Sequence, residues 1–330
     1  MTVSMDVTFT AWAALIAGLV ALLLFDLFVL HRGTHEVSIR NAAWSTAGFV
    51  AVSFAFGTVL GLAEGSTVAG EFFAGYLLEY SLSLDNVFVW SLIFTSFAIP
   101  PAYQHRVLFY GIFGALILRG AFVAAGAELL ARFEWVVYIF GALLIYAGVR
   151  MLRGRQRQID TERDPTVRLV RHLFPTTKGL RGAHLFVRAR GVPDQEKPER
   201  RALGGIWYAT PMLAVLAVIE FTDVIFALDS IPAIFGVTRE PFIVFSATAL
   251  ALVGLRSMYF LLAGARDRFR YLDVGLASIL VFIGAKFLLT EVVHIGVGVN
   301  LLVIVGVMTV AIVASLLASR RERRRMPVGP

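Results

Sequence analysis

The chain has 330 residues, of which 58% are hydrophobic and 16% are charged, and its mean hydropathy is +0.76. Soluble globular domains are typically about half apolar, so this composition excludes that class and indicates a polytopic helical membrane protein. The formal charge of +7 does not require nucleic acid as a partner, because membrane topology alone gathers basic residues on one side. The absence of cysteine excludes disulfides, thiolate metal sites and thiol catalysis.

Apolar windows of about 20 residues, the length that spans a bilayer, recur along the chain. They predict an all-α transmembrane bundle of about nine spans in one integral membrane domain, residues 1–330. The expected spans are 9–30, 42–63, 71–99, 107–130, 134–152, 205–228, 241–263, 273–290 and 296–318. The N-terminus lacks the basic region of a signal peptide, so we expect the first span to be retained. We expect the sixth helix to be interrupted near Asp229, because Pro232 follows closely.

The basic residues predict the orientation of these spans. One set of alternate connections contains nearly all the Lys and Arg outside the spans, whereas the other contains only Arg132 and Arg239. The basic set is expected to be cytoplasmic, which places the N-terminus outside and the C-terminus inside a plasma membrane. This set includes a basic loop at 153–204, expected to be solvated near anionic headgroups, and a basic tail at 319–330. We expect membrane lipids as partners and no nucleic acid, and a homo-oligomer stays open.

The two halves of the chain resemble each other. Equivalent positions are Asp85 and Asp223, Arg119 and Arg256, and Gly148 and Gly284, at separations of 136 to 138 residues. Under the predicted orientation spans three to five run opposite to spans six to eight, so we expect an inverted-topology repeat. In secondary transporters such repeats place the substrate site at their interface near the middle of the membrane. We therefore expect Asp85 and Asp223 to lie close together there.

Ionisable residues inside the predicted spans are the main functional signal. A charge at the centre of a bilayer costs about 2.5–3.5 kcal/mol on insertion scales, so these side chains cannot face lipid. Glu79, Ser83 and Asn86 are spaced at i, i+4 and i+7 and so share one helical face. The candidate metal-binding residues are Asp26, Glu79, Asp85, Asn86, Glu220, Asp223 and Asp229, with Arg119 and Arg256 as counter-ions or gating residues.

The donors in this set are carboxylate, amide and hydroxyl oxygens, without sulfur or histidine. Such hard ligands suit Mg²⁺, Ca²⁺ or Mn²⁺, and disfavour Cu(I) and, more weakly, Zn²⁺. A divalent ion neutralises only two charges, so we expect other carboxylates to be protonated or paired with Arg119 and Arg256. Purely structural ion pairs with these arginines are the alternative. His31, His35 and His105 are expected at the cytoplasmic surface rather than as ligands.

Four segments carry a family resemblance. They are LFDLFVLHRGTHEVS in the first span, GYLLEYSLSLDNVFVW in the third, PAYQHRVLFYG in the turn after it, and IEFTDVIFALDSIPAIFGVTREPFIV. These segments resemble the TerC family of integral membrane proteins, which is named for tellurium resistance and includes the Alx-type manganese exporters. The resemblance covers almost the whole chain. It implies efflux of Mn(II) from the cytoplasm and a role in metal homeostasis, with the acidic residues above and Asn86 forming the cation site.

The residues and the resemblance leave three functions open. The first is export of a divalent cation, with Mn(II) as the transported ion and no tightly bound cofactor. The second is a membrane scaffold or assembly factor for other membrane or exported proteins, which would use the basic loop at 153–204 for docking. The third is a tellurium-resistance component, although tellurite is an anion and this interior is acidic. We expect no enzyme, because no nucleophile–base or metal–histidine set is present.

Overall fold

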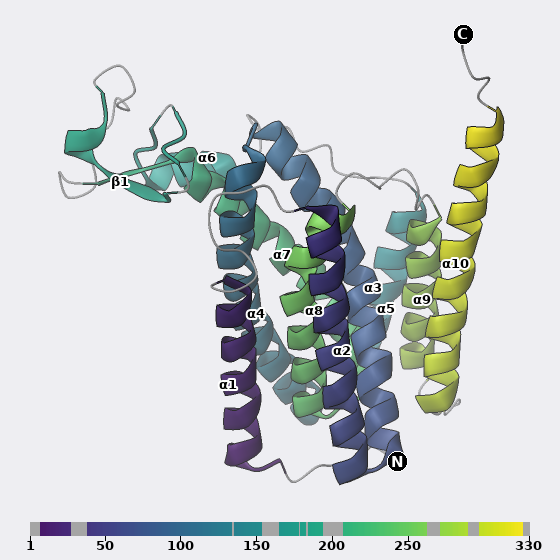
Figure 1. Cartoon of the computed structure of the whole chain (residues 1–330). Coiled ribbons are helices and arrows are strands. Elements are labelled where there is room, and N and C mark those ends of the chain that lie inside the picture. The colour runs from purple at the N-terminus through teal and green to yellow at the C-terminus, as the bar shows by residue number, and fades with distance from the viewer. Residues whose placement is uncertain are drawn as a thin grey trace.

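The computed structural model describes residues 7–27, 38–133, 135–153, 165–177, 179–182, 184–193, 207–262, 271–289 and 297–325. Within these ranges the chain forms a bundle of long helices, with a smaller segment projecting sideways from one end (Figure 1). The helices are α1 (Phe9–Phe25), α2 (Ile39–Glu64), α3 (Ser66–Ser96), α4 (Pro101–Arg132), α5 (Val136–Leu152), α6 (Pro165–Leu173), α7 (Pro211–Phe235), α8 (Pro241–Leu262), α9 (Leu272–Leu288) and α10 (Val297–Arg325). The strands β1 (Phe186–Arg188) and β2 (Trp207–Ala209) pair antiparallel, and a 3₁₀ turn, η2 (Ala189–Gly191), follows β1.

The helices confirm the predicted all-α membrane class. In the described part of the chain, six are long and apolar enough to cross a bilayer, namely α2, α3, α4, α7, α8 and the Gly298–Ala318 part of α10. Helices α1, α5 and α9 have 17 residues each, a length of about 26 Å at 1.5 Å per residue, against a hydrocarbon core of about 30 Å. Every predicted span falls on one of these helices. That the three shorter ones also cross the bilayer stays a prediction.

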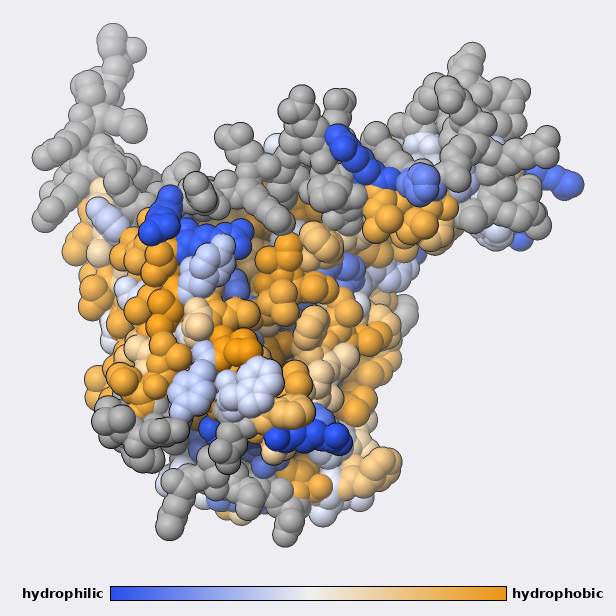
Figure 2. Space-filling model, turned by 180° about the vertical axis from the view of Figure 1, so that it is seen from behind, coloured by the Kyte–Doolittle hydropathy of each residue, from blue (hydrophilic) through white to orange (hydrophobic). Residues whose placement is uncertain are grey.

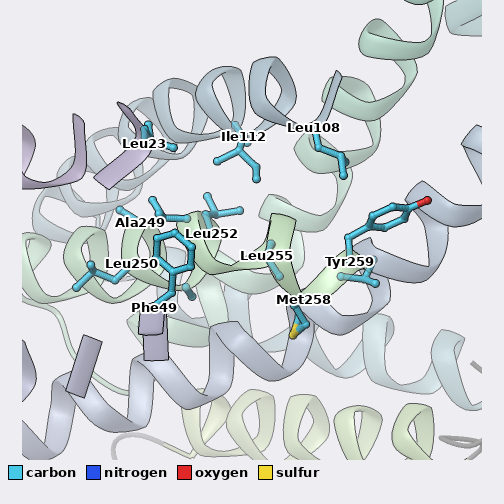
Figure 3. Close-up of a cluster of buried hydrophobic side chains, with 14 of the residues drawn as sticks. Leu23, Phe49, Leu108, Ile112, Ala249, Leu250, Leu252, Leu255, Met258 and Tyr259 are labelled. Atoms are coloured by element: carbon cyan, nitrogen blue, oxygen red, sulfur yellow. The ribbon is translucent and has the colours of Figure 1, made fainter. Parts of the chain in front are cut away.

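Helix α8 lies at the centre of the bundle. Its residues from Phe242 to Tyr259 are buried except for Phe245, which fits a helix that is apolar all round. Helices α2, α3 and α4 pack directly on it. Figure 3 shows Leu250, Leu252, Leu255 and Met258 of α8 among Leu23 of α1, Phe49 of α2, and Leu108 and Ile112 of α4. This apolar packing fixes the position of the helices that carry the charged residues described below.

Helix α7 is continuous where the sequence predicted an interruption. It runs from Pro211 to Phe235 and contains Pro232 in its last turn. Proline removes one helical hydrogen bond, but every residue from Ser230 to Phe235 is buried, so packing holds this turn in place. The N–H of Gly236 then donates to the Pro232 carbonyl oxygen at 3.1 Å and ends the helix. The prediction of a helix broken near Asp229 was wrong.

Helices α5 and α9 form the most extensive helix pair of the bundle, and they approach through glycine. A Cβ atom at Gly148 would lie 2.8 Å from the Ala277 carbonyl oxygen, and one at Gly284 would lie 2.7 Å from that of Gly141. Gly141 and Ala277 are separated by 136 residues, as are Gly148 and Gly284. In the predicted repeat Gly148 corresponds to Gly284, and Gly141 corresponds to Ala277. The contact of Gly148 with Ala277 is therefore equivalent to the contact of Gly284 with Gly141. These contacts are consistent with the inverted repeat, which stays a prediction.

The described residues of the predicted loop at 153–204 include α6 and β1. Helix α6 packs against α7, and the Ala209 N–H of β2 donates to the Pro175 carbonyl oxygen at 3.0 Å. The segment leads directly into α7, because Thr210 caps that helix by accepting a hydrogen bond from the Met212 N–H. The start of α7 is thus held by the segment that projects beside the bundle.

Replacing Gly284 with Ala should destabilise the fold, because the added methyl group meets the Gly141 backbone of α5. Overpacking of this kind costs about 1–3 kcal/mol, which exceeds the gain of about 1 kcal/mol in helix propensity. Gly306→Ala in α10 is the matched control, since nothing lies within 4 Å of its added Cβ. Melting temperatures of the purified variants in detergent measure both effects. A Gly284→Ala variant as stable as Gly306→Ala would refute close backbone contact between α5 and α9.

Candidate metal site between α3, α4 and α7

The guanidinium of Arg119 joins three helices in the interior of the bundle. Arg119, on α4, is only 1% exposed and forms ion pairs with Glu79 of α3 and Asp223 of α7. Its Nη2 donates to Asp223 Oδ1 at 3.1 Å and its Nε lies 3.5 Å from Oδ2, so the fork faces both carboxylate oxygens. Its Nη1 also reaches the Ser230 hydroxyl at 3.4 Å. Two of the carboxylates that the sequence placed within the membrane are thus brought together by an arginine.

The predicted polar face of α3 contributes to the same cluster. The Ser83 hydroxyl donates to Glu79 Oε1 at 3.1 Å, and Asn86 Nδ2 donates to Asp223 Oδ1 at 3.3 Å. Asn86 lies next in sequence to Asp85, whose side chain falls outside the described part of the structure. The hydrogen bond of Asn86 with Asp223 is thus one of the described contacts between the predicted repeats, and the expected proximity of Asp85 to Asp223 stays a prediction.

A small cavity of about 40 Å³ adjoins this cluster. It is lined by Glu79, Leu82, Ser83, Asn86, Arg119, Met151, Phe226, Asp229, Ser230 and Leu280. Glu79 Oε2 and Asn86 Oδ1 are buried, and neither has a hydrogen-bond partner among the described residues. Both atoms are acceptors, and leaving a buried acceptor unpaired costs about 1–3 kcal/mol. The cavity therefore offers oxygen lone pairs to a ligand that supplies positive charge or donors.

The formal charge around the cavity is negative. Glu79 and Asp223 pair with the buried guanidinium of Arg119, and Asp229 is a third acid that lines the cavity. Arg150 is close enough to Asp229 to act on it electrostatically. Nevertheless, no group of three His, Cys, Asp or Glu side chains in the described residues has the spacing of a metal site. Arg119 occupies the space between two of the candidate ligands. In this conformation the arginine neutralises Glu79 and Asp223 directly.

Two predicted ligands lie elsewhere. Asp26, at the end of α1, pairs with Arg256 of α8, whose Nη2 lies 2.5 Å from Asp26 Oδ2 and 3.0 Å from the Asp26 carbonyl oxygen. Glu220 of α7 packs its carboxylate against Gly114 of α4, where no side chain intervenes, and it is not among the residues that line the cavity. The structure therefore brings together Glu79, Asn86, Asp223 and Asp229 with Arg119.

Several polar residues were missed or misplaced by the sequence reasoning. Ser230 follows Asp229 directly and contacts Arg119, and its helical spacing of seven residues from Asp223 was the available signal. Glu71 of α3 is 4% exposed and accepts a hydrogen bond of 2.6 Å from the Thr238 hydroxyl. Glu71 also lies inside a predicted span, so its acidic side chain was the signal that could have identified it.

The predicted surface position of the histidines has a mixed outcome. His105 is buried, so its expected surface position was wrong. His31 and His35 fall in 28–37, which lies outside the described residues.

The fold and these contacts define a polytopic helical membrane protein with a charged polar cavity in its interior. The chain belongs to the integral membrane protein TerC family, whose sequence model matches residues 64–324. It is 43% identical to an uncharacterized membrane protein of Myxococcus xanthus, over 94% of this chain and 92% of the relative.

Two further relatives carry functional names. The chain is 40% identical to the putative membrane-bound redox modulator Alx of Salmonella typhi, over 96% of each chain. It is 38% identical to the tellurium resistance protein TerC of Serratia marcescens, over 92% of each. No solved structure matches this chain.

Replacing Arg119 with Met should strongly destabilise the protein. The change leaves Glu79 and Asp223 buried without their counter-charge, and breaking one side of a buried ion pair costs about 3–5 kcal/mol. The melting temperature and the yield of monodisperse protein after size-exclusion chromatography measure the loss. Adding Asp223→Asn to Arg119→Met should recover part of it, because one uncompensated charge is removed.

Arg132→Met is the control for this experiment. Arg132 pairs with Glu128 on the same helix, but both side chains are well exposed, at 70% and 60%, and such pairs contribute about 0–1 kcal/mol. Equal melting temperatures for Arg119→Met and Arg132→Met would show that the buried pair does not hold the three helices together.

Proposed function

We propose that this protein exports a divalent metal cation, with Mn(II) as its cargo, from the cytoplasm through the cavity between α3, α4 and α7. The observation that carries the proposal is the pair of buried, unpartnered acceptors, Glu79 Oε2 and Asn86 Oδ1, beside a cavity that Asp229 also lines. A cation satisfies such oxygens without needing an acceptor of its own. An anion would face the same oxygens and the surplus of acidic residues.

The donor set and the size of the cavity limit the choice of ion. Carboxylate, amide and hydroxyl oxygens suit hard divalent cations. A cavity of about 40 Å³ accommodates only a few water molecules, at roughly 10–15 Å³ each. Mg²⁺ keeps several waters when proteins bind it, so the space favours an ion that sheds its waters more readily. The family resemblance then favours Mn(II) over Ca²⁺.

Arg119 has a defined role in this proposal. Its guanidinium lies against the carboxylates of Glu79 and Asp223, which are the strongest candidate ligands. A divalent ion that binds both must displace the guanidinium, because the two positive groups repel each other at short range. Arg119 thus neutralises the acids when no metal is bound and withdraws when the metal enters. The acids stay compensated in both states, which a low-dielectric interior requires.

The names of the relatives fit this proposal only indirectly. Tellurium resistance is attributed to the Serratia marcescens protein, but an acidic cavity disfavours tellurite, which is an anion. A resistance role in this chain would therefore act through metal homeostasis rather than through tellurite transport. The orientation inferred from the basic residues, with the C-terminus in the cytoplasm of a plasma membrane, belongs to the same proposal.

Asp229→Asn is the sharpest test of the transport site. Asp229 lines the cavity but has no ion pair among the described residues, so the amide leaves Arg119 and its partners in place. We expect Mn(II) flux into proteoliposomes, followed by quenching of an enclosed dye, to fall at least about tenfold, the equivalent of about 1.4 kcal/mol. The melting temperature should stay within error of the wild type. Ca²⁺ and Mg²⁺ added as competitors test the order of preference.

Glu64→Gln, at the exposed end of α2, is the matched control and should transport like the wild type. Asp223→Asn should also lose transport, but with lower stability, because it removes a partner of Arg119. Wild-type flux in Asp229→Asn and Asp223→Asn together would refute the cavity as the path. Wild-type protein that moves none of the three ions would refute transport and favour the scaffold function.

A further inference from the structure

The segment that projects from the bundle has a composition unlike the rest of the chain. We define this lateral segment as α6, β1, η2, β2 and the described residues that connect them. It leaves the bundle at the end where α3 finishes and α4 begins. It then extends across the long axes of the helices rather than along them (Figure 1). The described residues of the segment include several arginines and no Asp or Glu. The described part of the segment therefore presents positive charge beside the expected cytoplasmic end of the spans.

Large apolar side chains of the lateral segment are exposed. Leu169 and Leu173, one turn apart on α6, are each 55% exposed, and Phe186 and Trp207 of the sheet are 40% and 42% exposed. The ring of Phe186 also packs edge-on against Phe174, with centroids 6.2 Å apart. Exposed apolar side chains gathered on one segment indicate a surface that is covered in the working protein.

Basic side chains lie next to these apolar ones. Arg168 and His172 are exposed and form the helical row adjacent to Leu169 and Leu173. The guanidinium of Arg188 lies over the Trp207 ring, 5.5 Å from its centroid. Figure 2, seen from behind, shows hydrophobic and strongly hydrophilic side chains side by side on this projection. An amphipathic helix with Leu and Arg side chains, together with an exposed Trp on the adjoining strand, is typical of segments that lie in a membrane interface.

We propose that the lateral segment lies on the cytoplasmic leaflet of the same bilayer, with Leu169 and Leu173 inserted among the acyl chains and the arginines bound to anionic phospholipid headgroups. Anionic lipids are the complementary partner for the arginines that the structure describes on this segment, and their attraction for Lys and Arg acts within a Debye length of the membrane. The packing of α6 on α7 and the direct connection of β2 to α7 keep the segment within that range. A protein partner would have to compete with lipid that is always present.

The lateral segment is rigidly coupled to the start of α7. The Thr210 hydroxyl donates to the His184 carbonyl oxygen at 2.6 Å, and the Thr210 N–H donates to that of Leu185 at 2.9 Å. Thr210 is itself fully buried. Lipid bound to the segment would therefore also position the helix that carries Asp223 and Asp229. The proposal concerns the membrane contact and does not rest on the nature of the transported ion.

The test uses a single nitroxide label in nanodiscs. The chain has no cysteine, so Leu173→Cys labels only the apolar row, and His172→Cys labels the adjacent basic row as a control. Collision rates with oxygen, which is enriched in hydrocarbon, and with a water-soluble nickel chelate are compared by electron paramagnetic resonance. In nanodiscs that contain phosphatidylglycerol, we expect the oxygen-to-nickel ratio at Leu173 to exceed that at His172 by at least about threefold, as for a side chain roughly 5–10 Å deep in the interface.

Replacing phosphatidylglycerol with phosphatidylcholine should lower the ratio at Leu173, and so should high salt. Equal ratios at Leu173 and His172 in the anionic nanodiscs would overturn the proposal. A Leu173 label shielded from both reagents would also overturn it, because it would indicate a protein partner or a second copy. A high ratio that does not depend on the lipid charge would overturn the headgroup interaction. Melting temperatures of both labelled variants should match the wild type, since these side chains are exposed.

Discussion

The structure depends on compensating charge that is buried in a low-dielectric interior. An isolated carboxylate in hydrocarbon is too costly to keep, so each must find a cation, a donor or a proton. Arg119 meets that need for Glu79 and Asp223 at once, and because the three residues lie on α4, α3 and α7, the ion pairs also determine which helices are neighbours. Apolar packing around α8 holds the rest of the bundle together.

Much of the fold and part of the site followed from the sequence. Hydropathy located the helices because the length of apolar windows is a direct physical requirement of the bilayer. The shared face of Glu79, Ser83 and Asn86, and the equivalence of the two halves, predicted that α3 and α7 meet at polar residues. The contact of Asn86 with Asp223 agrees with that expectation. The polar face of α3 could be read from the sequence because it rests on helical periodicity, whereas the inverted repeat and the expected proximity of Asp85 to Asp223 stay predictions.

The parts that were not predicted depend on tertiary packing. Pro232 does not break α7, because buried neighbours hold the last turn. Asp26 does not line the cavity, because it pairs instead with Arg256, which lies 230 residues further along the chain. Glu220 fits against Gly114 because that glycine leaves room for a carboxylate on the neighbouring helix. Composition alone does not distinguish an acid that lines a cavity from one that packs between helices.

The sequence separation of the buried partners constrains how the protein is made. Chains are synthesised and inserted from the N-terminus. Glu79 meets Arg119 after only 40 residues, so α3 and α4 can enter the membrane as a hairpin that carries its own neutralising pair. Asp223 joins 104 residues later, when Arg119 is already in place. Asp26, at the end of α1, has no Arg256 to pair with until α8 has been synthesised. Helix α1 therefore passes through assembly with a carboxylate that has to remain near the headgroups until α8 is inserted.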